Sequence, residues 1–153
     1  MNWTQLKDKI YFEDGSLRDI YVLGTNNHDW KKWVELINEK YTVEFFDGKA
    51  DLIKDKIDFK QIEDYWSVKN REIIYAKIKL ASVNIICHFF SESEIENHFD
   101  PQEVDSLDCH NEILAYLQDI AATLVNDVHM TDENYADSKL ITVKSNGDVK
   151  LSV

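Results

Sequence analysis

A clear strand pattern runs from Ile73 to Phe90, with the sequence IIYAKIKLASVNIICHFF. Every second residue of its first half is apolar, at Ile74, Ala76, Ile78 and Leu80. A second run, residues 83–90, follows directly and is rich in β-branched and aromatic side chains. A period of two is typical of strands that bury one face. The stretch therefore predicts two adjacent strands at the centre of a sheet.

Three dipeptides outside this stretch mark tight turns: Asp14-Gly15, Asp47-Gly48 and Asn146-Gly147. Asp-Gly and Asn-Gly tolerate the positive φ that a two-residue hairpin turn requires. The sequence therefore predicts three hairpins, which join residues 10–13 with 17–23, 42–46 with 49–53, and 140–144 with 149–153.

Two segments have the apolar spacing of amphipathic helices. The first carries Trp30, Trp33, Val34 and Ile37, and the polar residues 26–29 before it offer a cap. The second is a longer apolar stripe that begins at Ser106 or Asp108 and contains Ile113, Leu114, Leu117, Ile120, Ala121, Leu124, Val125 and Val128. Both helices are expected to pack on the sheet.

Shorter helical turns are predicted at Trp3–Lys9, at residues 59–65 and at residues 93–99. For the last of these, Ser91 and Glu94 have the spacing of a capping box, and Pro101 would end the helix. No repeat or Pro-rich linker divides the chain. We therefore expect an α+β fold in a single domain, residues 1–153, with a mainly antiparallel, meandering sheet and packed helices.

The charge of the chain is concentrated in one segment. Residues 80–138 hold thirteen acidic and no basic side chains, whereas residues 1–79 hold fifteen acidic and fourteen basic ones. The formal net charge of −12 therefore comes almost wholly from this segment. A small domain needs a net charge of only about 2 to 8 for solubility. The excess suggests an electrostatic field directed at a cationic partner.

Nine acidic residues of this segment are the candidate partner-binding residues: Glu92, Glu94, Glu96, Asp100, Glu103, Asp105, Asp108, Glu112 and Asp119. A basic protein is the expected partner class, because a chain with a pI near 4.7 is repelled by nucleic acid and by anionic membranes. The alternative interpretation is an ordinary solvated acidic surface. The sequence leaves the oligomeric state open.

The compartment is expected to be the cytoplasm. No run approaches the roughly 20 apolar residues of a membrane span, and residues 1–10 lack the apolar core of a secretory signal. Cys87 and Cys109 are expected to be free thiols, since cytosolic thiols stay reduced.

No catalytic signature appears in the sequence. The four glycines lie in predicted turns or after a strand, which leaves none for a phosphate-binding loop. The pairs Cys87-His88 and Cys109-His110, with His98 and His129, raise the question of a metal site. Neighbouring residues of a strand point to opposite faces, so Cys87 and His88 are not expected to share an ion. We expect no catalytic residue, no metal and no cofactor.

The N-terminal third carries a resemblance. The run from Tyr11 to Val22, YFEDGSLRDIYV, followed by Asp29-Trp30-Lys31-Lys32-Trp33, is similar to small bacterial proteins that resemble the immunity proteins of polymorphic toxins, including those of contact-dependent growth inhibition. The resemblance implies a cytosolic protein that binds and blocks a cognate toxin domain, often a cationic nuclease. Two alternatives stay open: a small enzyme or ligand-binding protein that uses Cys87 and His88, and an acidic interaction subunit for another basic partner.

Overall fold

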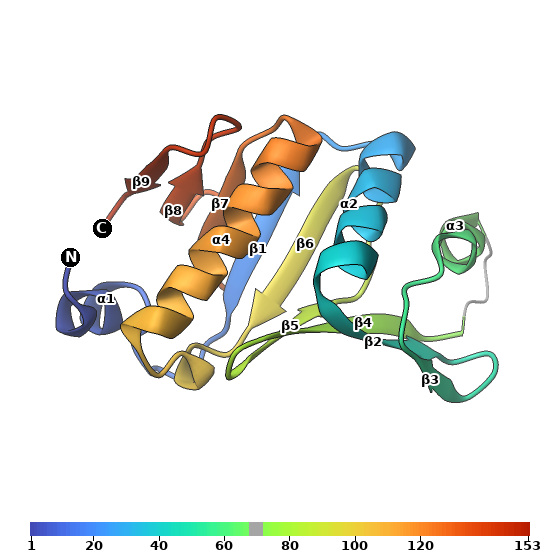
Figure 1. Ribbon diagram of the computed structural model, residues 1–153, viewed down its shortest axis with the longest axis horizontal. Coiled ribbons are helices and arrows are strands. Elements are labelled where there is room, and N and C mark those ends of the chain that lie inside the picture. Colours follow the sequence, from blue (N-terminus) through green and yellow to red (C-terminus); the bar gives the residue numbers. More distant parts are fainter. Residues whose placement is uncertain (68–71) are drawn as a thin grey trace.

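The computed structural model describes residues 1–67 and 72–153. Their strands form one antiparallel sheet in the order β3-β2-β4-β5-β6-β1-β7-β8-β9 (Figure 1). The strands are β1 (Arg18–Leu23), β2 (Thr42–Asp47), β3 (Leu52–Lys54), β4 (Ile74–Leu80), β5 (Val83–Cys87), β6 (Glu94–Phe99), β7 (Val128–Asp132), β8 (Lys139–Val143) and β9 (Val149–Leu151). The predicted α+β class is confirmed. The sheet meanders from β4 to β6 and from β7 to β9, with β1 inserted between the two parts.

The helices are α1 (Trp3–Lys9), α2 (Asn27–Lys40), α3 (Phe59–Ser67) and α4 (Leu107–Leu124), with a 3-10 turn at Pro101–Glu103. Helices α2 and α4 lie side by side across one face of the sheet (Figure 1). Helix α3 packs on α2 through Trp66, whose ring lies 5.3 Å from that of Trp30. None of the described helices is both long enough and apolar enough to span a membrane.

The two long helices form where the sequence predicts them. Helix α2 begins with a capping box between Asn26 and Asp29, and its buried residues are Trp30, Trp33, Val34 and Ile37. Helix α4 begins at the predicted cap Ser106, whose hydroxyl accepts from the Cys109 amide at 3.2 Å. Its apolar stripe closes the core over the sheet.

Strand alternation gives the sheet an inner face under α2 and α4 and an outer face away from them. The hydroxyl of Tyr116 on α4 donates to the side-chain oxygen of Asn97 on β6 at 2.6 Å, so Asn97 points inward. Its neighbours Glu96 and His98 therefore point outward. The register places Tyr21 opposite Glu96 and Asp19 opposite His98, so these two residues of β1 also belong to the outer face.

Two predicted hairpins and the predicted strand pair are present. Strands β2 and β3 pair through Phe45 and Lys54, with a connection two residues longer than predicted, and β8 pairs with β9 through Val143 and Val149. The pair β4 and β5 forms as expected, but β6 rather than this pair lies at the middle of the strand order.

The first predicted hairpin is wrong, because residues 10–13 form no strand. Arg18 explains the difference. Its buried guanidinium donates to the carbonyl oxygens of Ile10 at 2.7 Å and of Phe12 and Leu17 at 2.9 Å. The carbonyls that a hairpin ladder would use are thus bonded to a side chain, and the segment folds around it as a loop.

The predicted helix at residues 93–99 is also wrong. These residues form β6, which pairs with all six residues of β1. Inside the run, Ile95, Asn97 and Phe99 are buried while Glu94, Glu96 and His98 are partly exposed, a period of two that overrides the capping-box signal. Helix α4 ends earlier than the predicted stripe, because Val125 adopts a left-handed conformation with φ 51° and Val128 already belongs to β7.

Candidate functional site

The nine predicted acidic residues do not form one continuous surface. Glu94 and Glu96 lie on the outer face of the sheet. Asp108, Glu112 and Asp119 lie on α4, which covers the inner face, and Asp105 lies just before that helix. Glu92 precedes β6, Asp100 precedes the 3-10 turn, and Glu103 is the last residue of that turn. The segment without cations therefore presents acidic groups on two sides of the molecule.

Three of the nine carboxylates are used within the fold. Glu103 accepts from the backbone amide of Asn84 at 3.1 Å and from its side-chain amide at 3.0 Å. Asp100 accepts from the Gln102 amide at 2.9 Å and so caps the 3-10 turn. Asp119 forms an ion pair with Lys40 at 2.8 Å and accepts from the Tyr41 hydroxyl. These groups hold the fold together and have less capacity for an external cation.

The other six form no ion pair with any described residue: Glu92, Glu94, Glu96, Asp105, Asp108 and Glu112. Glu92 accepts a long hydrogen bond of 3.4 Å from Asn27, and Glu96 accepts one of 3.3 Å from the Tyr21 hydroxyl. Residues 80–138 contain no Lys or Arg, so any ion pair with their acids needs a cation from another segment. Among the described residues, only Lys40 and Lys144 form such pairs.

A cluster of two carboxylates and a phenol lies on the outer face. The Tyr21 hydroxyl lies 3.1 Å from the Asp19 carboxylate and 3.3 Å from that of Glu96. Burial raises the pKa of both carboxyl groups, and their mutual repulsion adds to the shift at Glu96. Asp19 is almost fully covered, because the backbone amide of Asn134 donates to it at 2.8 Å from the turn after β7. Glu96 is partly exposed and is the member of the cluster that can meet a partner.

A row of stacked rings crosses the neighbouring strands of the same face. Phe46 on β2 stacks on Tyr75 of β4 at 5.2 Å between ring centroids, and Tyr75 lies 6.0 Å from His88. His88 in turn stacks on Phe90 and on His98, each at 5.3 Å. We call these five residues the aromatic row. The aromatic row is not evident from the sequence, because alternation indicates which residues share a face of one strand but not which strands are neighbours.

The environment of the two histidines of the aromatic row disfavours their protonation. Partial burial lowers the pKa of His88, and the neighbouring His98 adds to that shift. Burial also lowers the pKa of His98, against the opposing effect of the Asp19 and Glu133 carboxylates. Both shifts favour the uncharged form of the stacked rings. The aromatic row therefore gives the outer face an apolar strip beside the Glu94 and Glu96 carboxylates.

The cysteine and histidine pairs do not combine into a reactive site. Cys87 is fully buried on the inner face, where burial raises its thiol pKa to about 12, while His88 lies on the outer face. His110 is buried and its Nδ1 lies 2.6 Å from the Tyr11 hydroxyl. Within residues 1–67 and 72–153, no group of three His, Cys, Asp or Glu side chains is arranged to hold a metal ion.

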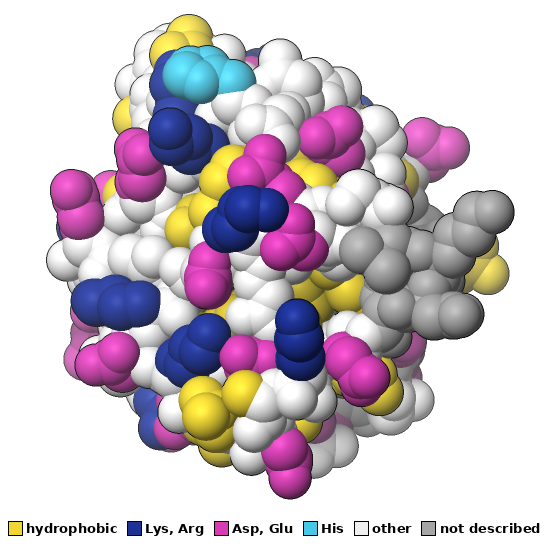
Figure 2. Space-filling model, turned by 90° about the vertical axis from the view of Figure 1, so that its right-hand side faces the viewer, with side chains coloured by type: hydrophobic (Ala, Val, Ile, Leu, Met, Phe, Trp, Pro, Cys, Tyr) yellow, Lys and Arg dark blue, Asp and Glu magenta, His cyan; other side chains and the backbone are white. Residues whose placement is uncertain are grey.

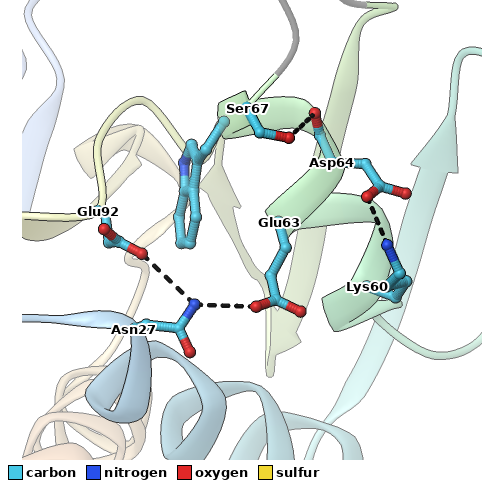
Figure 3. Close-up of a pocket in the computed structure, with 7 residues that line it drawn as sticks. Asn27, Lys60, Glu63, Asp64, Ser67 and Glu92 are labelled. Carbon is cyan, nitrogen blue, oxygen red and sulfur yellow. Dashed lines mark hydrogen bonds and ion pairs between the residues drawn. The ribbon is translucent and has the colours of Figure 1, made fainter.

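A pocket of about 450 Å³ lies between the start of α2, helix α3 and the loop at Glu92 (Figure 3). The Asn27 amide lies between two acids and donates to Glu63 at 3.1 Å and to Glu92 at 3.4 Å. Lys60 bonds to Asp64 at 2.6 Å. Lys60 is the one cation among the described residues that line the pocket, and because it is paired with Asp64 the pocket has little to attract an anionic ligand.

The end of the molecule that carries α3 and β3 has a surface of mixed sign. Figure 2 shows lysines and acidic side chains interspersed over this end. Ion pairs such as Lys54 with Asp47 at 3.0 Å and Lys60 with Asp64 at 2.6 Å belong to it. Helix α3 and strand β3 belong to residues 1–79, in which acidic and basic side chains are nearly equal in number, whereas residues 80–138 hold acidic side chains and no Lys or Arg.

Comparisons of the chain with family models, with curated proteins and with solved structures find no match.

Proposed function

We propose that this protein is an immunity protein, which binds and neutralises a cognate basic toxin domain through its acidic surface. The observation that carries the proposal is that eleven of the thirteen acids of residues 80–138 have no ion-pair partner among the described residues, the exceptions being Asp119 and Asp127. An acidic group that the fold does not use is available to a partner. The resemblance of residues 11–22 and 29–33 to immunity proteins supports the same conclusion.

The proposed mechanism is occlusion of the toxin by a preformed surface. Complementary charge raises association rates to about 10⁸ to 10⁹ M⁻¹s⁻¹ at low salt. Rapid capture suits an inhibitor that has to reach the toxin before the toxin reaches its substrate. A nuclease fits as the target, because its own substrate is a polyanion and its active face has to be cationic.

The proposal is tested by affinity capture with stepped salt. The immobilised chain is exposed to lysate of the source organism, and bound polypeptides are eluted by increasing salt and identified. We expect one basic polypeptide in near-stoichiometric amount, released by moderate salt because the contact is electrostatic. If no polypeptide is retained, or the retained one is acidic, the proposal fails.

A further inference from the structure

We propose that the outer face of the sheet around β5 and β6 is the docking surface, and that it takes a segment of a basic protein in which an Arg or Lys side chain neighbours an apolar one. This inference rests on the proposed function and identifies which of the two acidic sides makes the contact. It is carried by the arrangement of the aromatic row beside Glu94 and Glu96.

The described helices leave this face uncovered. Helices α2 and α4 pack on the inner face, and α3 packs on α2. Along β4, β5 and β6 the outward side chains are all partly or fully exposed: Tyr75, Lys77, Lys79, Asn84, Ile86, Glu94, Glu96 and His98. The described part of the chain covers β1 at one end, where Asn134 bonds to Asp19. A sheet face without a covering layer is a surface that a second protein can complete.

The chemistry of the face fits a protein interface. Phe90 is 60% exposed and stacks on His88, which makes it an accessible aromatic anchor. Interfaces are enriched in aromatic residues at their centres and have polar rims. Here Glu94 and Glu96 occupy the rim next to the aromatic row, and among the described residues of β1, β5 and β6 the only cation, Arg18, points inward. The cations of this face lie on β4, where Lys79 pairs with Glu44 at 3.1 Å and Lys77 lies opposite the same glutamate. An incoming Arg thus meets carboxylates beside an apolar strip.

Other occupants fit less well. Exposed aromatic rings on a sheet can stack nucleobases, but such surfaces track the phosphate backbone with cations, and here the rim is acidic. A second copy of the chain would bring Glu94 and Glu96 against the same face of its partner, with like charges opposed. A basic protein segment satisfies both the acids and the rings.

The test uses an amidated hexapeptide of alternating arginine and leucine as the probe, titrated into the ¹⁵N-labelled full chain and followed by NMR. We expect saturable shifts at the backbone amides of residues 88–98 and of β1. The variant Phe90→Ser with Glu94→Gln should weaken binding about tenfold, since it removes an aromatic anchor and a charge. Both side chains are accessible, and an unchanged melting temperature verifies that the fold is intact.

The matched control is Leu107→Ser with Glu112→Gln on α4, where Leu107 is 43% exposed. It should leave the affinity within twofold. Shifts that cluster on α4, with the control variant as the weaker binder, overturn this inference while leaving an acidic surface that binds basic protein. Shifts scattered over the whole molecule, or no saturable binding, also overturn it. The capture experiment decides the proposed function separately.

Discussion

Glu96 faces Tyr21 across the pairing of β6 and β1, with the phenol hydroxyl 3.3 Å from the glutamate carboxylate. The same hydroxyl also lies 3.1 Å from Asp19. One phenol proton serves two carboxylates that repel each other. At neutral pH the repulsion between the Asp19 and Glu96 carboxylates destabilises the outer face, and no cation among the described residues pairs with either group. A cation from a partner would reduce this repulsion.

Replacing Glu96 by Gln should stabilise the free protein at pH 7, by on the order of 0.5 kcal/mol after allowance for solvent screening. The pKa of Glu96 is raised in the folded state. A raised carboxyl pKa means that the folded state binds the proton more tightly, so stability falls as pH rises through the raised pKa. Urea unfolding at pH 4 and pH 7 should show the gain at pH 7 only. Glu112→Gln, on the exposed side of α4, is the control, and an equal gain in both variants would contradict the cluster's role.

Replacing Arg18 by Met should destabilise the protein by about 3 kcal/mol. The Arg18 guanidinium bonds to three carbonyl oxygens of residues 10–17, and its side chain is fully buried. Met fills the space but leaves those carbonyls without donors. Equilibrium urea unfolding measures the change. A loss below about 1 kcal/mol would mean that water replaces the guanidinium easily.

Replacing Tyr116 by Phe should cost about 1 to 3 kcal/mol, because it removes the donor to the buried Asn97 side chain. The Asn97 amide nitrogen already has no hydrogen-bond partner among the described residues. Tyr41→Phe, which removes a half-buried hydroxyl from Asp119, should cost less.

The double variant Tyr116→Phe with Asn97→Val should regain most of that loss, since both members of the buried polar pair become apolar. Thermal unfolding of the unaltered protein, of Tyr116→Phe, of Asn97→Val and of the double variant provides the comparison. A double variant as unstable as the sum of its single changes would show that the pair shapes the core by more than its hydrogen bond.

Reversing Asp105, Asp108 and Glu112 to Lys should slow association with the basic partner and reduce its salt dependence, while the dissociation rate stays nearly constant. These acids lie at the start of α4, away from the proposed contact, and act through the long-range field. Asp119 is left intact because it is paired with Lys40. Stopped-flow kinetics at several salt concentrations measures both rates, and a large rise in dissociation rate would place the contact on α4 instead.

The sequence predicted those parts of the fold that depend on local pattern. Alternation in residues 74–80 and the spacing of Trp30, Trp33 and Ile37 correctly indicated β4 and α2. The prediction from local pattern was wrong where a contact with a side chain outside the segment overrides the local signal. Residues 10–13 bond to Arg18, and the turn signal at Gly15 alone does not reveal this.

Part of the candidate surface could be predicted from the sequence, and part of it depends on which strands are neighbours in the sheet. The charge of residues 80–138 is evident from the sequence, but its division between α4 and the outer face follows from strand register. The aromatic row joins residues of β2, β4 and β6 with His88 and Phe90 from the segment after β5. The spacing of Phe46, Tyr75 and His88 in the sequence does not reveal that their rings are neighbours.

Growth rescue measures directly whether this protein neutralises a toxic polypeptide in a cell. The basic polypeptide captured from the source organism is expressed in a bacterial host from an inducible promoter, with and without this protein. The proposal predicts growth arrest by that polypeptide alone and restored growth when this protein is co-expressed, with a 1:1 complex in the lysate. Arrest that persists despite abundant folded protein, or a captured polypeptide without toxicity, would contradict the claim that this chain is an immunity protein.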